Sequence, residues 1–242
     1  MAQTALITGA TGGIGWAIAE ALLAKGMLVI GAGRRQDRLD ELARQGGERF
    51  HGLMLDVVDP RAPDRLIERL PERLQQISVL INNAGHEVGG YRRFDEGSAQ
   101  DWDDIIATNL GGLMRITRAV VPGMIERGRG SIVNIGSTSG LTAKPDSAAY
   151  IASKFAVHGF SQALRADYAR TPIRVIEILP GLTRTEFALR RWRGDDARAA
   201  GFYDSFPACL SPQDVARSVV FALDQPRDVT IAQLVVMPQG QW

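Results

Sequence analysis

Tyr150 and Lys154 form the pair of residues in this sequence that most clearly suggests chemistry. They lie four positions apart in an apolar, Ala-rich stretch, so in a helix their side chains share one face. A phenol loses its proton near pH ~10, and a cation one turn away favours the phenolate and lowers that pKa. The pair could therefore act as a general acid and base. Most pairs at this spacing are surface residues, so a functional role requires further features in the same chain.

A glycine-rich segment near the N-terminus predicts a site for a dinucleotide. Residues 5–15 read ALITGATGGIG, which is an apolar strand followed by a turn that opens a helix. Gly9 permits the tight turn, while Gly13 and Gly15 permit close approach of the backbone and close contact between helix and strand. The first N–H groups of the helix would then face a pyrophosphate. The alternative is a plain strand-to-helix turn that uses glycine only for its geometry.

The end of the second predicted strand favours NADP(H) over NAD(H). The dinucleotide fingerprint usually places an acidic residue there to hold the ribose 2′-OH. Gly33 occupies that place in this sequence, and Arg34 and Arg35 follow it. Without the carboxylate a 2′-phosphate is not repelled, and a guanidinium offers it a fork of donors. Alternatively, the two arginines cap a strand end on the surface.

Composition indicates an ordinary globular protein of one domain. The chain has 242 residues, of which 45% are hydrophobic and 23% are charged. A net charge of +1 gives no electrostatic reason to expect nucleic acid or a membrane as partner. Cys209 is the single cysteine, which excludes an internal disulfide and fits a cytoplasmic protein. The scattered histidines make no ligand cluster, so we expect no metal, and neither a signal peptide nor a membrane span is visible.

Apolar and amphipathic segments alternate along the chain. Short apolar runs predict buried parallel strands at 5–8, 27–32, 52–55, 79–81, 131–135, 174–179 and 233–237. Amphipathic stretches predict helices at 13–25, 37–44, 63–70, 102–126, 149–168 and 212–223. This alternation implies an α/β fold, a single Rossmann domain over 1–242 with a doubly wound parallel sheet of about seven strands and helices on both faces. Residues 183–207 break the pattern and predict a helical flap over the active site.

Together these motifs resemble the short-chain dehydrogenase/reductase family over nearly the whole chain. Besides the glycine motif, the family's order is kept by Leu55-Asp56-Val57, by Asn82-Asn83-Ala84-Gly85 and by Pro180-Gly181-x-x-x-Thr185. One departure is Gly136, where many members carry a second serine. The resemblance implies a catalytic set made of Asn109, Ser137, Tyr150 and Lys154. It implies cofactor contacts at Gly9, Thr11, Gly12, Gly13, Ile14, Gly15, Arg34, Arg35, Asp56, Val57, Asn83, Ala84, Gly85, Tyr150, Lys154, Pro180, Gly181, Thr183 and Thr185.

The resemblance also implies a role for each member of the catalytic set. Tyr150 would exchange a proton with the substrate oxygen while hydride moves between the substrate carbon and the nicotinamide. Lys154 would lower the pKa of Tyr150 and hold the nicotinamide ribose. Ser137 would donate a hydrogen bond to the substrate oxygen. Asn109 would hold a water that links Lys154 to solvent.

The C-terminal third is most similar to the branch of 3-hydroxy acid and serine (L-allo-threonine) dehydrogenases, which also reduce malonic semialdehyde. The sequence around Arg191 in the flap carries part of this similarity. It implies a small anionic hydroxy acid or semialdehyde as substrate, with contacts from Ser137, Thr138, Tyr150 and Arg191. The alternative interpretation is that the arginines of the flap lie on the solvated surface or contact another subunit. A homotetramer formed through 102–126 and 149–168 is the family expectation.

Other functions stay open on the sequence alone. A carbonyl reductase for neutral ketones and a sulfonate-aldehyde reductase would use the same catalytic set. A non-catalytic NADP(H)-sensing protein is a third possibility, but it would have no chemical need to keep all four residues of the catalytic set. His86 and Glu87 either line the pocket or lie on a surface loop. Tyr203 and Phe206 are candidates to close the flap over the nicotinamide.

Overall fold

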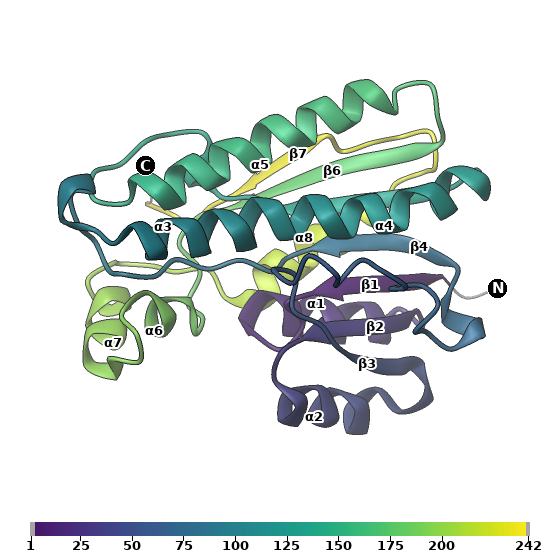
Figure 1. Ribbon diagram of the computed structural model, residues 1–242, viewed down its shortest axis with the longest axis horizontal. Coiled ribbons are helices and arrows are strands. Elements are labelled where there is room, and N and C mark those ends of the chain that lie inside the picture. Colours follow the sequence, from purple (N-terminus) through teal and green to yellow (C-terminus); the bar gives the residue numbers. More distant parts are fainter. Residues whose placement is uncertain (1–2, 241–242) are drawn as a thin grey trace.

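A seven-stranded parallel sheet lies between two layers of helices in the computed structural model, which describes residues 3–240 (Figure 1). The strand order is β3-β2-β1-β4-β5-β6-β7, so the order reverses between β1 and β4. This doubly wound sheet confirms the predicted Rossmann fold. The strands are β1 (Thr4–Thr8), β2 (Leu28–Gly33), β3 (Phe50–Met54), β4 (Ile77–Asn82), β5 (Gly130–Ile135), β6 (Ile173–Pro180) and β7 (Gln233–Val236).

The helices divide between the two faces of the sheet. One face is covered by α1 (Gly13–Ala24), α2 (Gln36–Gly46) and α8 (Pro212–Leu223). The other face is covered by α4 (Leu113–Glu126) and α5 (Ala148–Asp167), with α3 (Ala99–Ile106) packed against α5. Within residues 3–240, no helix combines the length and the apolar character that crossing a membrane requires.

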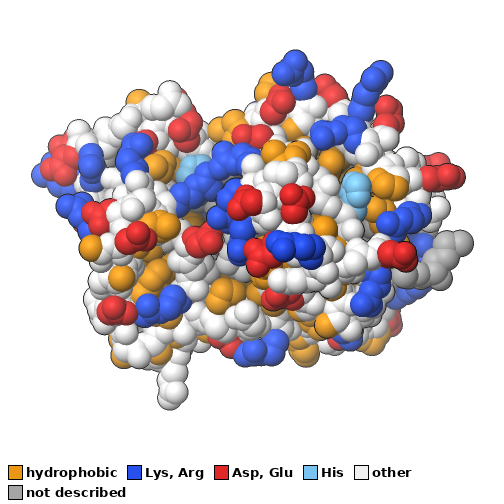
Figure 2. Space-filling view, turned by 90° about the horizontal axis from the view of Figure 1, so that it is seen from below, with side chains coloured by type: hydrophobic (Ala, Val, Ile, Leu, Met, Phe, Trp, Pro, Cys, Tyr) orange, Lys and Arg blue, Asp and Glu red, His pale blue; other side chains and the backbone are white. Residues whose placement is uncertain are grey.

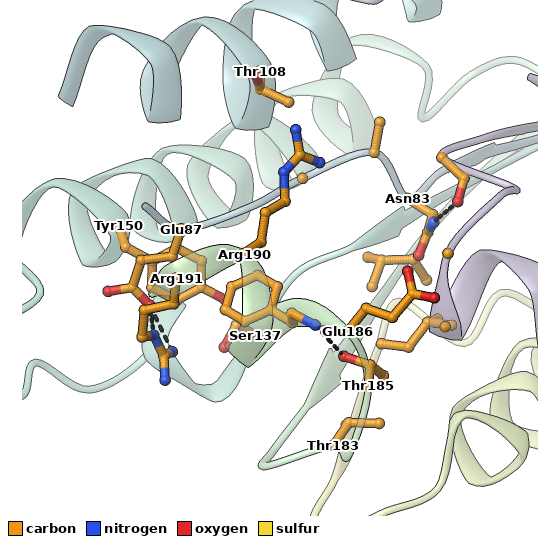
Figure 3. A pocket seen from close by; sticks show the side chains of 18 of the residues that line it. Asn83, Glu87, Thr108, Ser137, Tyr150, Thr183, Thr185, Glu186, Arg190 and Arg191 are labelled. Atoms are coloured by element: carbon orange, nitrogen blue, oxygen red, sulfur yellow. Dashed lines mark hydrogen bonds and ion pairs between the residues drawn. The ribbon is translucent and has the colours of Figure 1, made fainter. Parts of the chain in front are cut away.

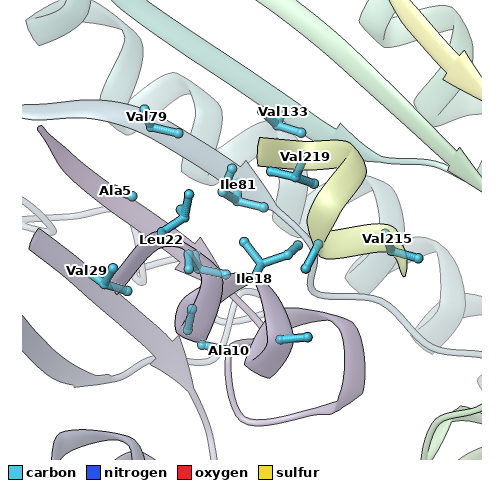
Figure 4. Packing of buried hydrophobic residues seen from close by; sticks show 14 of the residues in the cluster. Ala5, Ala10, Ile18, Leu22, Val29, Val79, Ile81, Val133, Val215 and Val219 are labelled. Carbon is cyan, nitrogen blue, oxygen red and sulfur yellow. The ribbon is translucent and has the colours of Figure 1, made fainter. Parts of the chain in front are cut away.

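Buried apolar side chains fix this arrangement because the strands β1 to β6 contribute to both faces of the sheet. Ile81 of β4 faces the layer of α1 and α8, while Leu80, its neighbour, faces the layer of α4 and α5. Figure 4 shows Ile18 and Leu22 of α1 packed with Val219 of α8 against the sheet. Burial of each such side chain contributes about 1.5–3 kcal/mol. The two apolar cores, one on each face of the sheet, hold the carboxyl ends of the strands, where the site lies.

Two of the predicted helices differ from the structure. Residues 63–70 form turns instead of a helix, because Arg65 has a φ of 56°, which is incompatible with a right-handed helix. The predicted helix 102–126 is divided into α3, a π-helical turn (Ala107–Gly112) and α4. Such turns add a residue to the helix and are frequent at functional sites. Asn109 lies in this one.

The predicted flap is built from two short helices outside the sheet. These are α6 (Phe187–Arg191) and α7 (Asp196–Asp204). Ala188, Ala199 and Tyr203 form a small apolar cluster between them. The hydroxyl of Tyr203 also donates to the carbonyl of Thr185 at 3.1 Å, which ties α7 to the segment that leaves β6. The flap is thus a folded unit attached to the sheet at the predicted place.

Candidate active site

The glycine-rich turn after β1 has the conformation that a phosphate cradle requires. Gly9 has a φ of +66°, and a Cβ added to it would lie 2.9 Å from Cα of Ala84. A Cβ on Gly13 would lie 2.7 Å from the Thr185 side chain. A Cβ on Gly15 would lie 2.5 Å from Nδ2 of Asn83, so this glycine serves close contact between helix and strand. The turn can therefore lie this close to the neighbouring segments only because these positions carry no side chain.

A cavity of about 740 Å³ opens at the carboxyl edge of the sheet and extends beneath the flap. Its size is that of a site for a cofactor and a small substrate. Asn109 and Gly15 are the two predicted site residues that do not line it. The predicted residues that line it are Gly9, Thr11, Gly12, Gly13, Ile14, Arg34, Arg35, Asp56, Val57, Asn83, Ala84, Gly85, Ser137, Thr138, Tyr150, Lys154, Pro180, Gly181, Thr183, Thr185 and Arg191.

Arginine side chains surround the end of this cavity beside β2. A Cβ on Gly33 would lie 2.7 Å from Cγ2 of Thr11, so an acidic side chain at the end of this strand would displace Thr11. Arg34, Arg35 and Arg190 all line the cavity, and positive charges are gathered on the face shown in Figure 2. The lack of a carboxylate at position 33 and the three guanidinium groups fit the 2′-phosphate of NADP(H).

Two of these arginines already have acidic partners. Nη1 of Arg34 is 3.6 Å from the carboxylate of Asp56, and Nη1 of Arg35 is 2.9 Å from that of Glu186. Arg35 also donates to the carbonyl of Thr11. These contacts leave the guanidinium groups partly exposed and orient them along the edge of the cavity.

Tyr150 and Lys154 lie one turn apart at the start of α5, as predicted. Nζ of Lys154 is 5.9 Å from the centre of the Tyr150 ring and donates to the carbonyl of Ile135 at 3.0 Å. Ser137, at the end of β5, faces Tyr150 from the opposite wall and lines the same cavity. The three side chains therefore meet where an alcohol oxygen could contact both hydroxyl groups.

The pKa values of this pair reflect their deep position. Burial raises the pKa of Tyr150, the charge of Glu87 adds to this rise, and a hydrogen bond with Ser137 opposes it. Burial lowers the pKa of Lys154 to about 8. The sequence-based prediction of a lowered Tyr150 pKa was wrong. It took account of the Lys154 cation but not of desolvation, which raises the pKa of a phenol. At neutral pH Tyr150 is thus a proton donor.

Asn109 uses its side chain to fasten the active site together. Its Oδ1 accepts from the N–H of His86 at 2.8 Å, and its Nδ2 donates to the His86 carbonyl at 2.9 Å and to Oγ of Ser153 at 3.0 Å. The amide thereby joins the loop after β4 to α5. Because the amide is occupied, a water held by Asn109 would have to bind its backbone.

A buried ion pair joins the flap to the loop after β4. Nε and Nη2 of Arg191 lie 2.8 and 2.6 Å from Oε2 of Glu87, and Ser147 donates to Oε1 of the same carboxylate at 2.8 Å. Figure 3 shows this pair beside Tyr150. Nη1 of Arg191 has no hydrogen-bond partner among the described residues. Arg191, expected as a substrate contact, is therefore both a structural tie and a donor with unused capacity.

Several cavity residues were not singled out from the sequence. Tyr91, Phe187 and Phe202 place their rings 4.4–5.3 Å from the Arg191 guanidinium, and Ser147 orients Glu87. For Glu87 the sequence analysis allowed either a pocket position or a surface loop. In the structure it is buried in the pocket wall. Its place just beyond β4, where ligands bind in such sheets, was the available signal. The aromatic residues carried no signal distinguishable from packing.

The fold and this site define a dinucleotide-dependent oxidoreductase, and comparisons with known proteins identify its family. A model described as short chain dehydrogenase matches residues 3–195. The chain therefore belongs to the short-chain dehydrogenase family. Its enzyme class and its cofactor, NADP(H), follow from this match and from the relatives described next, and both agree with the sequence-based predictions.

These relatives resemble the chain over nearly its whole length. NADP-dependent 3-hydroxy acid dehydrogenase YdfG of Escherichia coli (strain K12) is 40% identical over 98% of this chain and 95% of its own. Sulfoacetaldehyde reductase 2 of Chromohalobacter salexigens is 40% identical over 100% of this chain and 96% of its own. The closed form of serine dehydrogenase complexed with NADP+ superposes with a TM-score of 0.96 at 39% identity, covering 99% of this chain and 96% of that one.

Proposed function

We propose that this enzyme transfers a hydride between NADP(H) and a small anionic hydroxy acid or the corresponding semialdehyde. The observation that carries this proposal is Arg191, a residue that is only 6% exposed and lines the same cavity as Tyr150, and whose Nη1 has no partner among the described residues. A buried donor without a partner is costly, and an anionic group of a substrate would satisfy it.

Tyr150 and Ser137 carry the proton and the developing charge in this proposal. In reduction, Tyr150 donates its proton to the substrate oxygen, and Ser137 donates a hydrogen bond to the same oxygen. NADP(H) supplies or accepts the hydride when bound. Lys154, as an ammonium, stabilises the phenolate that Tyr150 becomes. The side chain of Asn109 holds the loop after β4 against α5. Its backbone would bind a water that links Lys154 to solvent, so that a proton can return to Tyr150.

The names of the relatives support an acidic substrate. A 3-hydroxy acid, sulfoacetaldehyde and serine each combine an acidic group with an alcohol or aldehyde. In this chain the same combination would be matched by Arg191 for the acid and by Tyr150 for the oxygen. Glu87 beside Arg191 would in addition favour a substrate that carries an ammonium group, as serine does.

A carbonyl reductase for neutral ketones is the second candidate. Glu87 neutralises Arg191, and Phe187, Tyr91 and Phe202 give the cavity apolar walls. If Glu87 fully compensates Arg191, a neutral substrate loses nothing on entering this site. Substrate preference separates the two candidates.

A substrate panel with Arg191 variants tests the proposal. Wild type, Arg191→Lys and Arg191→Met are assayed with NADP+ on 3-hydroxypropanoate, L-serine, 2-hydroxyethanesulfonate and propan-2-ol. We expect the KM for the acids to rise at least about tenfold in Arg191→Lys, because the fork of donors is lost, and to rise further in Arg191→Met. Equal effects on propan-2-ol and on the acids would refute the clamp. The exposed Arg184→Met is the control.

We further propose that the enzyme assembles as a homotetramer through α4 and α5. Met114, Ile125 and Phe155 on these helices are each more than 40% exposed. Apolar side chains on neighbouring helices favour contact with a second copy. Light scattering after size exclusion is expected to give the mass of four chains, and Phe155→Glu is expected to reduce it.

A further inference from the structure

Beneath α5, strand β6 carries a buried carboxylate to which the proposed chemistry gives no role. Glu177 is 0% exposed, and its Oε1 has no hydrogen-bond partner among the described residues. Desolvating a carboxylate is costly unless an opposite charge or donors compensate it. An acidic side chain at this position is therefore expected to have a function.

Glu177 lies directly behind the floor of the active site. It pairs in register with Asn134 of β5, and a Cβ added to Gly136 would lie 2.9 Å from its Oε1. Gly136 lines the cavity and precedes Ser137. The small residue at 136, where many members of the family have serine, leaves this carboxylate oxygen without a side-chain donor.

A row of polar residues on α5 runs from the active site past Glu177 to the surface. Tyr150, Lys154, His158 and Gln162 follow one another at intervals of four residues, so the row winds slowly around the helix. Figure 1 shows α5 alongside β6 and β7. The buried carboxylate thus lies below the middle of the row.

His158 connects the carboxylate to the exposed end of this row. Its Nδ1 is 2.7 Å from Oε2 of Glu177, and its Nε2 is 2.6 Å from the amide nitrogen of Gln162. The imidazole ring therefore joins the buried carboxylate of Glu177 to Gln162 and fixes the position of Oε2.

We propose that Glu177, held by His158, is a positioning residue that keeps Lys154 protonated during catalysis. Nζ of Lys154 donates to the carbonyl of Ile135, and Oε1 of Glu177 lies beside the next residue, Gly136, so the two groups meet at the same end of β5 without a direct bond. Their charges interact through the poorly polarisable interior. Burial lowers the pKa of Lys154 to about 8, and the charge of Glu177 acts in the opposite direction. Without this carboxylate, Lys154 would lose its proton closer to neutral pH. The effect on turnover depends on the proposed role of Lys154, whereas the charge coupling does not.

The surroundings of Glu177 make Lys154 its natural electrostatic partner. Two titratable side chains of α5 interact with it, because His158 lies 2.7 Å from Oε2 and the charge of Glu177 acts on the pKa of Lys154. The neighbouring strands place uncharged residues beside it, Asn134 on β5 and Gln233 on β7. A change of charge at Glu177 is therefore expected to change the pKa of Lys154.

The composition of the chain allows a direct measurement of this coupling. Lysine occurs only at positions 25, 144 and 154, so NMR signals of lysine labelled at Cε can be assigned with Lys25→Arg and Lys144→Arg. We expect the measured pKa of Lys154 to fall by about one unit or more in Glu177→Gln and to fall less in Glu177→Asp. Ser161→Ala, which removes a buried but uncharged contact to Asn134, is the matched control.

Kinetics then link the charge of Lys154 to turnover. The alkaline limb of kcat for reduction of malonic semialdehyde by NADPH is expected to move to lower pH in Glu177→Gln by the same shift, and to stay in place in Ser161→Ala. An unchanged Lys154 pKa in folded Glu177→Gln overturns the proposal, whatever the substrate of the enzyme is. A shifted pKa with an unmoved kcat limb removes Glu177 from catalysis.

A second variant protects the test against loss of folding. Glu177→Met combined with His158→Leu replaces the buried polar pair by apolar side chains, a change that interiors often tolerate. It is expected to lower the Lys154 pKa as Glu177→Gln does. An unchanged pKa in this folded double variant likewise overturns the proposal.

Discussion

Glu87 and Arg191, 104 positions apart in the sequence, form a buried ion pair in which Nε and Nη2 of the arginine lie 2.8 and 2.6 Å from one carboxylate oxygen. The pair fastens α6 of the flap to the loop after β4. Tyr150 lies beside it, so the contact that holds the flap also shapes the electrostatic surroundings of the proposed acid. The attachment of the flap and the charge around Tyr150 therefore depend on the same two side chains.

Removal of the Glu87 charge is expected to destabilise the protein. Glu87→Ala leaves the Arg191 guanidinium buried and without its partner, which costs about 3–5 kcal/mol of unfolding free energy. Denaturant unfolding monitored by circular dichroism measures it. Asp204→Asn, which breaks the exposed pair with Arg184, is the control and is expected to cost about 0–1 kcal/mol. Equal losses in both variants would contradict a structural role for the buried pair.

Tyr150→Phe is expected to remove turnover and to preserve cofactor binding. The phenylalanine keeps the ring that packs against Phe187 but has no proton to donate. We expect kcat to fall at least about 10²–10⁴-fold, as loss of a general acid does. NADPH fluorescence measures binding, and absorbance at the nicotinamide band measures turnover. A kcat close to wild type would eliminate Tyr150 as the acid.

The protonation of Lys154 predicts the alkaline side of the pH profile. Its pKa is lowered to about 8 by burial, so the ammonium is present below this pH and is lost as pH rises through it. Loss of the cation destabilises the Tyr150 phenolate that forms when the substrate is reduced. We therefore expect kcat for reduction to fall above pH about 8. A kcat that stays level up to pH 10 would contradict the role of Lys154.

Arg34 is expected to determine cofactor preference. Its guanidinium lies where the 2′-phosphate is predicted, and its Nη1 is 3.6 Å from the Asp56 carboxylate, a weak contact that a phosphate can replace. Arg34→Ala should weaken NADP+ binding about tenfold to a hundredfold and leave NAD+ binding nearly unchanged. Isothermal titration measures both. Arg38→Ala, whose side chain stacks on Trp16, is the control.

Gly13→Ala tests the contact between the phosphate cradle and the flap. The new methyl group would collide with Thr185, at 2.7 Å, and force the segment after β6 to move. We expect a loss of about 1–3 kcal/mol in stability and weaker NADP+ binding. Thermal unfolding with and without NADP+ measures both. Gly201→Ala, which meets no atom within 4 Å, is the control, and similar losses in both would refute the contact.

Local patterns in the sequence were sufficient to predict the sheet and the members of the site that follow strands. Each predicted strand is present, because short apolar runs favour burial in a parallel sheet. The predicted burial of 233–237 was wrong, since β7 is the edge strand and Val235 is exposed. The helix at 63–70 was wrong because amphipathic spacing does not reveal the left-handed φ of Arg65. The π-helical turn at Asn109 was equally invisible, since one added residue leaves the apolar pattern nearly intact.

Contacts between distant segments were beyond sequence reasoning. Nothing local in the sequence indicates that Glu87 meets Arg191, or that Glu177 meets His158. The pKa of Tyr150 shows the same limit, because its spacing from Lys154 is local whereas its burial depends on the whole fold. Sequence spacing thus shows which ionisable groups share a helix face, whereas burial in the folded protein shifts their pKa values.

The closeness of Gly33 to Thr11 constrains how cofactor preference could evolve. An acidic residue at position 33 would suit NAD(H), but its Cβ would collide with the Thr11 side chain. An acidic residue at position 33 is therefore expected to need a smaller residue at position 11 beside it. Preference for NADP(H) thus depends on the packing between these two positions as well as on the arginines, and Gly33→Asp alone is expected to disturb the cradle.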